Sequence, residues 1–288
     1  MLLFRPGAPK PGALTEDHAL DTTVHAVILG AGQGRRLLPL TETSPKCLLR
    51  VGGRTMLEWQ MRALAACDVR EVSVITGFGA DAVDAAAAEI GARVGLRART
   101  RYNPFYAVAD NAGSCYVARD LLRGGTRVLM NGDTLFEPAV LARALTASAP
   151  VSVTVDRKAA YDADDMKVEL DGTRLRAIGK TLPPERTGAE SIGLLVFQGD
   201  GGALFGAALE RVLRRPDGLR RWYLSAVDLL AGEAEVGTVS IEGLSWGEVD
   251  VPADLERAEG LVQGWLAAED SAEARSERDD SRPRSYAR

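Results

Sequence analysis

Short runs of consecutive apolar residues alternate along the chain with segments in which apolar residues recur at helical spacing. Residues 24–30 (VHAVILG) are nearly all apolar and end at a glycine, which is typical of a buried parallel strand. Residues 72–76 and 127–131 predict two more strands, and residues 55–67 and 80–90 predict helices. This repeated β-α-β order predicts an α/β fold with a doubly wound, mostly parallel sheet that carries helices on both faces.

The pattern changes after Pro150. Four short apolar segments joined by turns predict a small antiparallel β insertion over residues 151–197, with strands at 151–156, 167–170, 175–178 and 192–197. The chain then returns to helical spacing, which predicts helices near 201–214, 222–232 and 252–267. The insertion therefore interrupts the parallel pattern.

The two ends of the chain have too little apolar surface to support a core. Residues 1–22 begin with a four-residue apolar patch followed by prolines, and we expect a flexible arm. Residues 268–288 are dominated by charged side chains and predict a disordered tail. Residues 23–267 are the expected single domain.

Composition excludes several classes of function. The 35 basic and 40 acidic residues give a net charge of −5 without a dominant basic stripe, so neither nucleic acid nor a membrane is an expected partner. Three scattered cysteines are too few for a disulfide scaffold, which favours a cytoplasmic location. The two histidines, His18 and His25, exclude a catalytic triad whose histidine lies late in the chain.

The segment after the first predicted strand is the most informative. Residues 29–41 (LGAGQGRRLLPLT) place glycines where backbone N–H groups can surround an anion, and Arg35, Arg36 and Lys46 add cationic donors. This combination predicts a loop that binds a nucleoside triphosphate. A chance glycine-rich turn between strand and helix is the alternative.

Two common phosphate-binding motifs are excluded. A dinucleotide fingerprint would need its third glycine at the position of Arg35. Gly179, Lys180 and Thr181 look like the end of a Walker A loop, but the first glycine of that motif would fall on Arg174.

Two carboxylates follow predicted strands and suit a magnesium ion. Asp133 and Asp250 would meet at the carboxyl edge of the sheet, where Mg²⁺ usually binds together with phosphates, and Glu248 projects to the same side as Asp250. The alternatives are structural: Asp133 as a turn or cap residue, and Asp250 or Asp254 as the cap of the last helix.

These motifs together resemble the nucleotidyltransferases that join a nucleoside triphosphate to a phosphorylated small molecule. The resemblance spans about residues 24–262 and rests on residues 30–41 with Pro45 and Lys46, on residues 131–133 and on residues 246–250. It implies a Rossmann-like fold of the nucleotide-diphospho-sugar transferase type. It also implies that Arg35 holds the β- and γ-phosphates and Lys46 the transferring phosphate or the acceptor, while Gly30 departs from the alanine of many relatives.

Residues 101–117 resemble a segment that bacterial phosphocholine and phosphonate cytidylyltransferases place beside the nucleoside. The resemblance implies base or ribose contacts from Asn111 and Ser114, with residues 76–78 lining the base; a helix N-terminus capped by Asp110 or Asn111 is the alternative. The full set of expected nucleotide-binding residues is Leu29, Gly30, Ala31, Gly32, Gln33, Gly34, Arg35, Lys46, Thr76, Gly77, Asn111, Ser114 and Asp133.

The resemblance to this non-sugar subgroup continues in the predicted insertion. It implies that Lys180 contacts the phosphate or phosphonate of the acceptor, although an exposed lysine at a strand end would look the same. The expected acceptor-binding residues are Lys167, Lys180, Glu190 and Tyr223, and the expected catalytic residues are Arg35, Lys46 and Lys180.

The predicted function is a Mg²⁺-dependent cytidylyltransferase that transfers CMP from CTP to a small non-sugar phosphate or phosphonate and releases pyrophosphate. An acceptor phosphate is already a nucleophile at neutral pH, so no general base is required. The alternatives are a sugar-1-phosphate nucleotidyltransferase and a nucleotide sensor without catalysis. CTP and the acceptor are the expected partners, with a homodimer left open.

Overall fold

The computed structural model describes the backbone of residues 23–280 and the side chains of residues 23–269. The predicted arm at residues 1–22 and the last part of the predicted tail, residues 281–288, lie outside the described residues. No helix of the described part is both long and apolar enough to cross a membrane.

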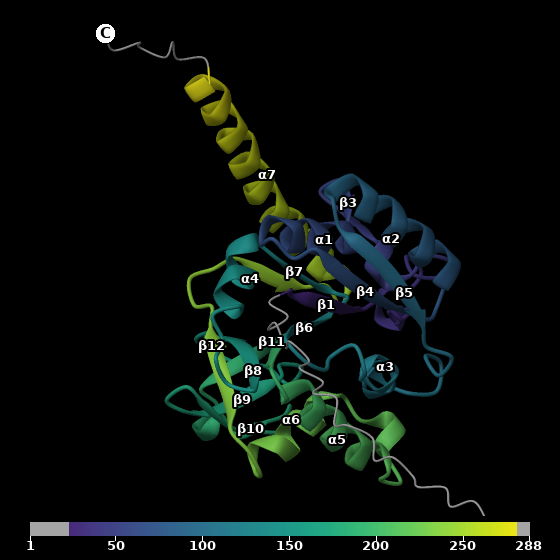
Figure 1. The fold of residues 1–288 in the computed structure, drawn as a ribbon, viewed down its shortest axis with the longest axis vertical. Coiled ribbons are helices and arrows are strands. Elements are labelled where there is room, and N and C mark those ends of the chain that lie inside the picture. Colours follow the sequence, from purple (N-terminus) through teal and green to yellow (C-terminus); the bar gives the residue numbers. More distant parts are fainter. Residues whose placement is uncertain (1–22, 281–288) are drawn as a thin grey trace, which may run out of the picture.

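A nine-stranded sheet forms the centre of the molecule, in the order β5-β4-β1-β6-β11-β8-β12-β10-β9 (Figure 1). Strands β5, β4, β1 and β6 are parallel to one another, as the β-α-β pattern predicts. The nine strands are β1 (His25–Leu29), β4 (Glu71–Thr76), β5 (Arg97–Tyr102), β6 (Thr126–Asn131), β8 (Val151–Asp156), β9 (Lys167–Asp171), β10 (Arg174–Ile178), β11 (Ala189–Gln198) and β12 (Val236–Ser240).

The predicted insertion at residues 151–197 is present as strands β8 to β11, but it is not a separate layer. Strand β11 lies between β6 and β8 and is antiparallel to both, and β12 returns parallel to β8. Nine of the ten residues of β11 are buried, because Leu195 and Phe197 pack in the core on one face of the sheet and Leu194 and Val196 in the core on the other. The antiparallel strands therefore continue the main sheet, and the β9–β10 hairpin at its end curls back so that β9 also pairs with the start of β11.

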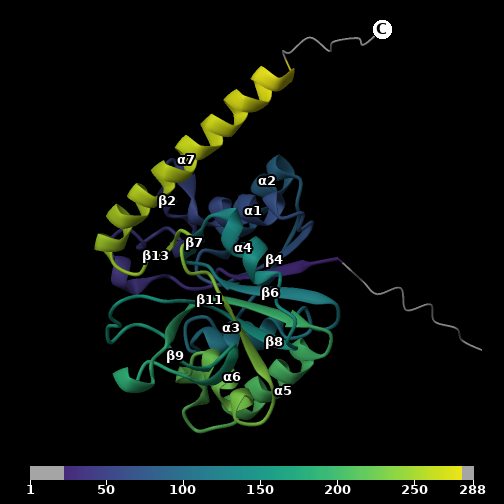
Figure 2. The same cartoon turned by 90° about the vertical axis from the view of Figure 1, so that its left-hand side faces the viewer.

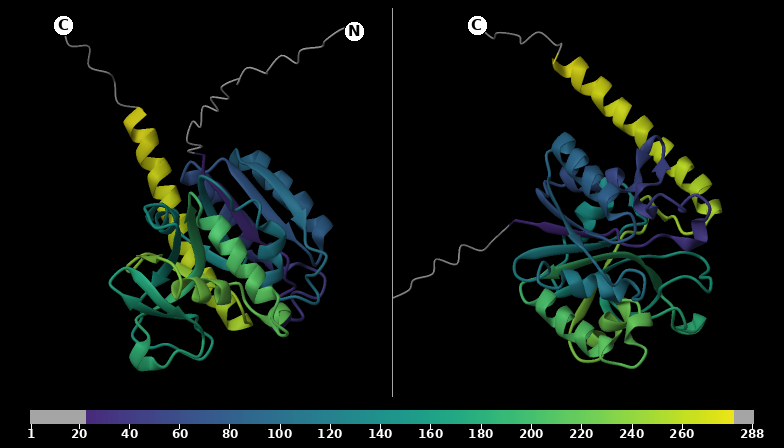
Figure 3. Two further views of the ribbon diagram at one scale, coloured as in Figure 1. Left: turned by 60° about the horizontal axis from the view of Figure 1, so that its bottom comes forward. Right: turned by 90° about the vertical axis from the view of Figure 1, so that its right-hand side faces the viewer.

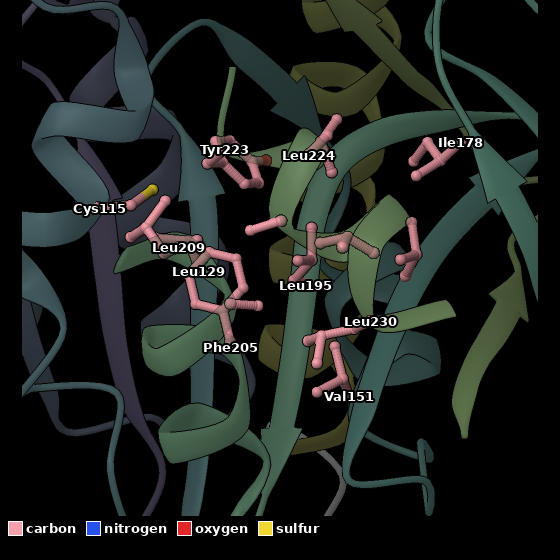
Figure 4. Packing of buried hydrophobic residues seen from close by; sticks show 14 of the residues in the cluster. Cys115, Leu129, Val151, Ile178, Leu195, Phe205, Leu209, Tyr223, Leu224 and Leu230 are labelled. Atoms are coloured by element: carbon pink, nitrogen blue, oxygen red, sulfur yellow. The ribbon is translucent and has the colours of Figure 1, made fainter. Parts of the chain in front are cut away.

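Helices cover both faces of this sheet (Figures 2 and 3). Alternate residues of β1 enter different clusters: Ala26 and Ile28 pack with α1, α2 and α4, while Val27 packs with α3, α5 and α6. Figure 4 shows part of the cluster that contains Val27, where Tyr223 and Phe205 pack edge to face. These helices are α1 (Met56–Ala66), α2 (Ala80–Val94), α3 (Asn111–Ala118), α4 (Pro138–Ala144), α5 (Gly201–Leu213) and α6 (Leu224–Ala231).

The last helix, α7 (Pro252–Asp280), begins against the body and then projects away from it (Figures 1 and 2). The prediction of a disordered tail is wrong for residues 268–280, which continue this helix. These residues lack glycine and proline and are rich in alanine, glutamate and arginine, which all favour helix. Low apolar content thus excludes a packed core here but does not exclude secondary structure.

Two short antiparallel ribbons complete the part of the fold that matters for the site. Strand β2 (Arg50–Val51) pairs with β3 (Arg54–Thr55), and β7 (Thr134–Phe136) pairs with β13 (Trp246–Glu248). The second ribbon joins the segment that follows β6 to the segment that precedes α7, although the two are more than 100 residues apart in the chain.

Candidate active site

A cavity of 1420 Å³ opens at the carboxyl ends of β1 and β6. Ligands of α/β sheets bind at this edge. The glycine loop, residues 106–111, residues 162–166 and the segment from Trp246 to Asp250 all contribute to its wall. The structure therefore brings together segments from the whole length of the described chain.

The glycine loop is folded back onto the sheet and then onto Lys46. The backbone N–H of Gly30 donates to Ile75 O at 2.9 Å, and the Thr41 hydroxyl donates to Gly34 O at 2.9 Å. Gly34 has a φ of 74°, and a Cβ on it would lie 2.9 Å from Cδ of Lys46. Only glycine fits this position without strain, because the loop must pass directly over the Lys46 side chain.

Lys46 bridges the two carboxylates that we predicted as metal ligands. Its Nζ lies 2.6 Å from Oδ2 of Asp133 and 2.6 Å from Oδ1 of Asp250. Burial alone would lower the pKa of Lys46, but the two carboxylates raise it above its usual value. Lys46 is therefore a fixed positive charge between Asp133 and Asp250.

The β7–β13 ribbon holds these carboxylates together. Asp133 lies in the turn between β6 and β7, and its carbonyl oxygen accepts a hydrogen bond from Val249 N at 3.1 Å. Asp254 lies in the first turn of α7, and its Oδ2 accepts from the backbone N–H groups of Asp250 and Val251, the two residues before the helix, at 2.7 and 2.8 Å. The Asp250 carboxylate is thus left to face Lys46.

Glu248, the third predicted ligand, stands at the side of this pair. Its carboxylate can be reached from the cavity, and Asn131 Nδ2 donates to it at 3.5 Å. Enclosure by the cleft, followed by the negative charges of Asp133 and Asp250, raises the pKa of Glu248 to about 8. A carboxylate in this setting is stabilised when a cation is added.

Asp133 and Asp250 fit a divalent cation that takes two carboxylates from the protein. Oδ1 of Asp133 is buried and has no hydrogen-bond partner among the residues that the structure describes, so one oxygen is left for a ligand. Within the same part of the chain, no three His, Cys, Asp or Glu side chains are grouped closely enough to form a complete site. Two protein carboxylates are nevertheless sufficient for Mg²⁺, which usually completes its shell with phosphate and water.

Arg36, rather than Arg35, reaches across the cavity. Its guanidinium lies 2.9 Å from Oδ2 of Asp250 and 2.5 Å from Oδ2 of Asp164, a residue of the loop that precedes β9. Arg35, the predicted phosphate-binding residue, also lines the cavity, and both arginines are exposed. The sequence could not rank two adjacent arginines, because their directions depend on the short helix that the loop forms at Arg35–Leu37.

Most of the predicted nucleotide-binding residues line the cavity, but Gly30, Thr76 and Gly77 lie behind its wall. A Cβ on Gly77 would lie 2.6 Å from Cβ of Tyr106 and 2.7 Å from Ala31 O, so this glycine permits close packing behind the loop. Thr76 is fully buried. We correct the predicted direct contacts of these three residues to a supporting role.

Asn111 and Ser114 line the cavity and also tie its wall together. Asn111 Oδ1 accepts from the backbone N–H of Tyr223 at 2.9 Å, and Ser114 Oγ is bonded to Asn103 Nδ2 at 3.0 Å. The cap of α3 is Asp110, whose carboxylate accepts from Asn111 N at 2.8 Å. The capping alternative is therefore right for Asp110, while Asn111 remains available at the cavity.

On the predicted acceptor side, Lys180 lies between a carboxylate and an aromatic ring. Its Nζ is 2.6 Å from Oδ1 of Asp164 and 4.5 Å from the centre of the Trp222 ring. The Nζ of Lys158 forms ion pairs with Oε2 of Glu190 at 3.0 Å and with Oδ1 of Asp165 at 2.8 Å. All of these side chains line the cavity.

Two predicted acceptor-binding residues have other roles. The Lys167 ammonium group donates to the backbone carbonyls of Asp162 and Lys180, so it holds the loop before β9, and Lys167 does not line the cavity. Tyr223 borders the cavity but is fully buried, and its hydroxyl donates to Asn131 Oδ1 at 3.2 Å. The prediction is therefore wrong for Lys167, whereas Tyr223 stays at the cavity wall with its hydroxyl bonded to Asn131.

The acidic loop before β9 and the residue Asn131 also belong to the site, although the sequence did not predict a role for them. Asp162, Asp164 and Asp165 all line the cavity, and their spacing (DADD) directly before a strand is the signal that was available. Asn131 was visible only as part of the 131–133 motif. Its position between Tyr223 and Glu248 depends on the fold.

Comparison with known proteins agrees with this geometry. The family model described as the MobA-like NTP transferase domain matches residues 26–174, just over half of the chain. The match includes the glycine loop, Lys46 and Asp133.

Two curated relatives match most of this chain. The CMP-5'-(3-aminopropyl)phosphonate synthase of Streptomyces rubellomurinus is 32% identical over 247 residues, which are 82% of this chain and 38% of that protein. The bifunctional IPC transferase and DIPP synthase of Rubrobacter xylanophilus is 34% identical over 252 residues, 85% of this chain and 53% of that protein. The chain thus spans between about two fifths and half of the length of these relatives.

Among solved structures, the CTP:phosphocholine cytidylyltransferase of Streptococcus pneumoniae has a similar fold. The TM-score is 0.67 at 19% identity, covering 83% of this chain and 99% of that one. The similarity confirms the predicted nucleotidyltransferase fold.

Proposed function

We propose, on the premise that the chain belongs to the MobA-like NTP transferase family, that it transfers CMP from CTP to the phosphate or phosphonate of a small non-sugar acceptor. The observation that carries the proposal is the convergence of Asp133, Asp250 and Lys46 beside the glycine loop in one cavity. A nucleotide sensor without catalysis would need the loop but not this paired acidic arrangement. The similarity to a CMP-5'-(3-aminopropyl)phosphonate synthase supports CTP and a phosphonate or phosphate acceptor.

The reaction is an in-line displacement at the α-phosphorus. An acceptor oxygen attacks, the new P–O bond forms, and the bond to the bridging oxygen breaks so that pyrophosphate leaves with its electron pair. The acceptor dianion needs no general base at neutral pH. Backbone N–H groups of the glycine loop, together with Arg35 and Arg36, would hold the departing pyrophosphate, while Lys46 would offset charge on the transferring phosphate.

A divalent metal is typical of this family, and we propose Mg²⁺ held by Asp133 and Asp250 with Glu248 beside them. When bound, the ion supplies positive charge to the phosphate oxygens. Lys46, which lies between the two aspartates, would add a second positive charge beside the α-phosphate. The unpartnered Oδ1 of Asp133 supports this assignment.

The acceptor end of the cavity favours a small molecule that carries a positive charge beside its phosphorus group. Asp164, Asp165 and Glu190 supply carboxylates, and the face of Trp222 already has a cation 4.5 Å from its centre, that of Lys180. Such a carboxylate and aromatic setting stabilises an ammonium group. Aminoalkylphosphonates and phosphocholine have this chemistry, and Lys180 would contact their anionic group.

A pyrophosphate-release screen tests the proposal. CTP, UTP, ATP and GTP are each combined with 2-aminoethylphosphonate, phosphocholine, phosphonoformate and glucose 1-phosphate, with MgCl₂ present. We expect release with CTP and an ammonium-bearing acceptor. A preference for another triphosphate, or for glucose 1-phosphate, would overturn the proposed function in favour of a different nucleotidyltransferase.

A further inference from the structure

Gln60 is a buried polar residue that lies directly beneath the turn carrying Asp133. It belongs to α1, and only 1% of its surface is exposed. Its Nε2 donates two hydrogen bonds, to Asn131 O at 2.6 Å and to Thr134 O at 2.8 Å. These two carbonyls flank the turn residues Gly132 and Asp133 on either side.

The side-chain amide has one orientation that these contacts permit. Both carbonyl partners are acceptors, so Nε2 must face them and Oε1 must face away. Oε1 is then buried without a hydrogen-bond partner among the described residues. A buried unsatisfied oxygen destabilises the fold, so an apolar side chain would serve packing alone better. The two donated bonds are the feature that requires glutamine.

The turn has little freedom once these bonds are made. A Cβ on Gly132 would lie 2.5 Å from Leu29 O, so the turn runs tightly against the end of β1. On the other side, the Thr134 hydroxyl donates to Ile192 O at 3.1 Å. The turn that carries Asp133 is therefore held by three sets of contacts: the close approach to Leu29 O, the bond from Thr134 to Ile192 O, and the two bonds from Gln60.

We propose that Gln60 is a positioning residue for Asp133. It fixes the two carbonyls around residues 132 and 133 and so sets the direction in which the Asp133 carboxylate meets Lys46 and the proposed cation. The inference rests on the proposed function, because it assigns Gln60 to the support of that reaction. Gln60 itself makes no contact with substrate and acts only through the turn at residues 132 and 133.

The test compares Gln60→Met with wild type and with Gln198→Met. Methionine keeps the length of the side chain but removes both donors. Gln198 is the matched control: its Nε2 also donates to a backbone carbonyl, that of Ala147 at 3.2 Å, and it pairs with Thr126 at the opposite end of β6 from the site. Thermal unfolding shows that each variant folds.

The first readout is the exchange of backbone hydrogens for deuterium in a peptide covering residues 126–136, which needs neither substrate nor metal. We expect faster exchange in Gln60→Met near residues 132–134, and no such local change there in Gln198→Met. The second readout is the metal dependence of CMP transfer. Loss of a residue that supports a metal ligand typically weakens metal affinity or activity by about 10- to 100-fold. We expect the MgCl₂ concentration for half-maximal rate to rise, or kcat to fall, in that range, with the acceptor KM unchanged.

Unchanged exchange and unchanged metal dependence in a folded Gln60→Met would overturn the inference, and so would equal effects in Gln198→Met. If Gln60→Met does not fold, Gln60→Glu carries the test, because it keeps the shape and places a carboxylate oxygen against the two carbonyls. Failure of both variants to fold would assign Gln60 to global stability and reject the positioning role. A wild type that is inactive with every substrate refutes the proposed function, whereas an active wild type with an unaffected variant refutes only the role of Gln60.

Discussion

Replacing Lys46 by methionine removes the positive charge between Asp133 and Asp250 while keeping most of the side-chain stem. In wild type, Nζ makes a charge-assisted hydrogen bond of 2.6 Å to each carboxylate. Such a bond contributes about 1.5–3 kcal/mol. We take the lower value for each, because the Asp133 and Asp250 side chains keep 23% and 29% of their surface exposed.

The free energy of unfolding should therefore fall by about 3 kcal/mol. In a domain of this size, this corresponds to a melting temperature lower by roughly 6–12 °C. A divalent cation should restore much of the loss, since a ligand at 100 times its Kd stabilises the folded state by about 2.7 kcal/mol. In wild type the same cation has to compete with the Lys46 ammonium group and should stabilise less.

The assay is urea unfolding of both proteins, without nucleotide, with and without MgCl₂. NaCl at the same ionic strength controls for general screening of charge. CMP transfer by the variant should be lost in parallel. A Lys46→Met protein that is as stable as wild type and insensitive to MgCl₂ would refute the view that Asp133 and Asp250 share one cation-binding position.

Three further substitutions test separate parts of the site. Asp133→Asn keeps the shape of the side chain but removes its charge, so the rate of pyrophosphate release should fall by about 100-fold or more while the circular dichroism spectrum stays unchanged; a variant with normal turnover would remove Asp133 from the mechanism. Burial, opposed in part by Lys158, raises the pKa of Glu190 to about 7. The stability that this carboxyl group contributes is therefore complete below about pH 4.5 and is lost as the pH rises through 7. In denaturant titrations Glu190→Gln should gain stability relative to wild type between pH 5 and pH 8, and a difference that does not vary with pH would contradict this. Gly193→Ala should lower the free energy of unfolding by about 2 kcal/mol or more. Gly193 has a φ of 73°, and the new Cβ would lie 2.3 Å from Nδ2 of Asn131. Wild-type stability of the variant in guanidinium unfolding would show that the chain can relax there.

The parallel half of the fold could be predicted because its strands are continuous apolar runs followed by turns. The exception is β5, which the sequence analysis missed. Its sequence RARTRY carries three arginines and has a burial pattern with no fully buried residue. As the edge strand it has a neighbour on one side only, so it does not need the apolar pattern of an interior strand.

The glycine loop and the paired aspartates were predictable as well, since they follow the strands β1, β6 and β13, and Lys46 was predictable as a cation close behind the loop. What the sequence could not give was the partner of each polar group. Lys167 and Lys180 are close in sequence and similar in chemistry, yet the first is bonded to backbone carbonyls and the second lies in the cavity. Gln60 gave no signal, because a single glutamine in an apolar helix face has no recognisable motif.

The β7–β13 ribbon has a consequence for the order in which the site is completed during synthesis. Strand β12 ends at Ser240, so a chain released up to that point contains every strand of the main sheet and the whole glycine loop. It lacks the Val249 N–H that donates to the Asp133 carbonyl, and it lacks Asp250 and Asp254, whose carboxylate accepts from the Asp250 N–H. A nascent or truncated chain ending near residue 245 would therefore present Lys46 with one carboxylate instead of two. The short segment that follows β12 is therefore the one that turns a folded sheet into a complete site.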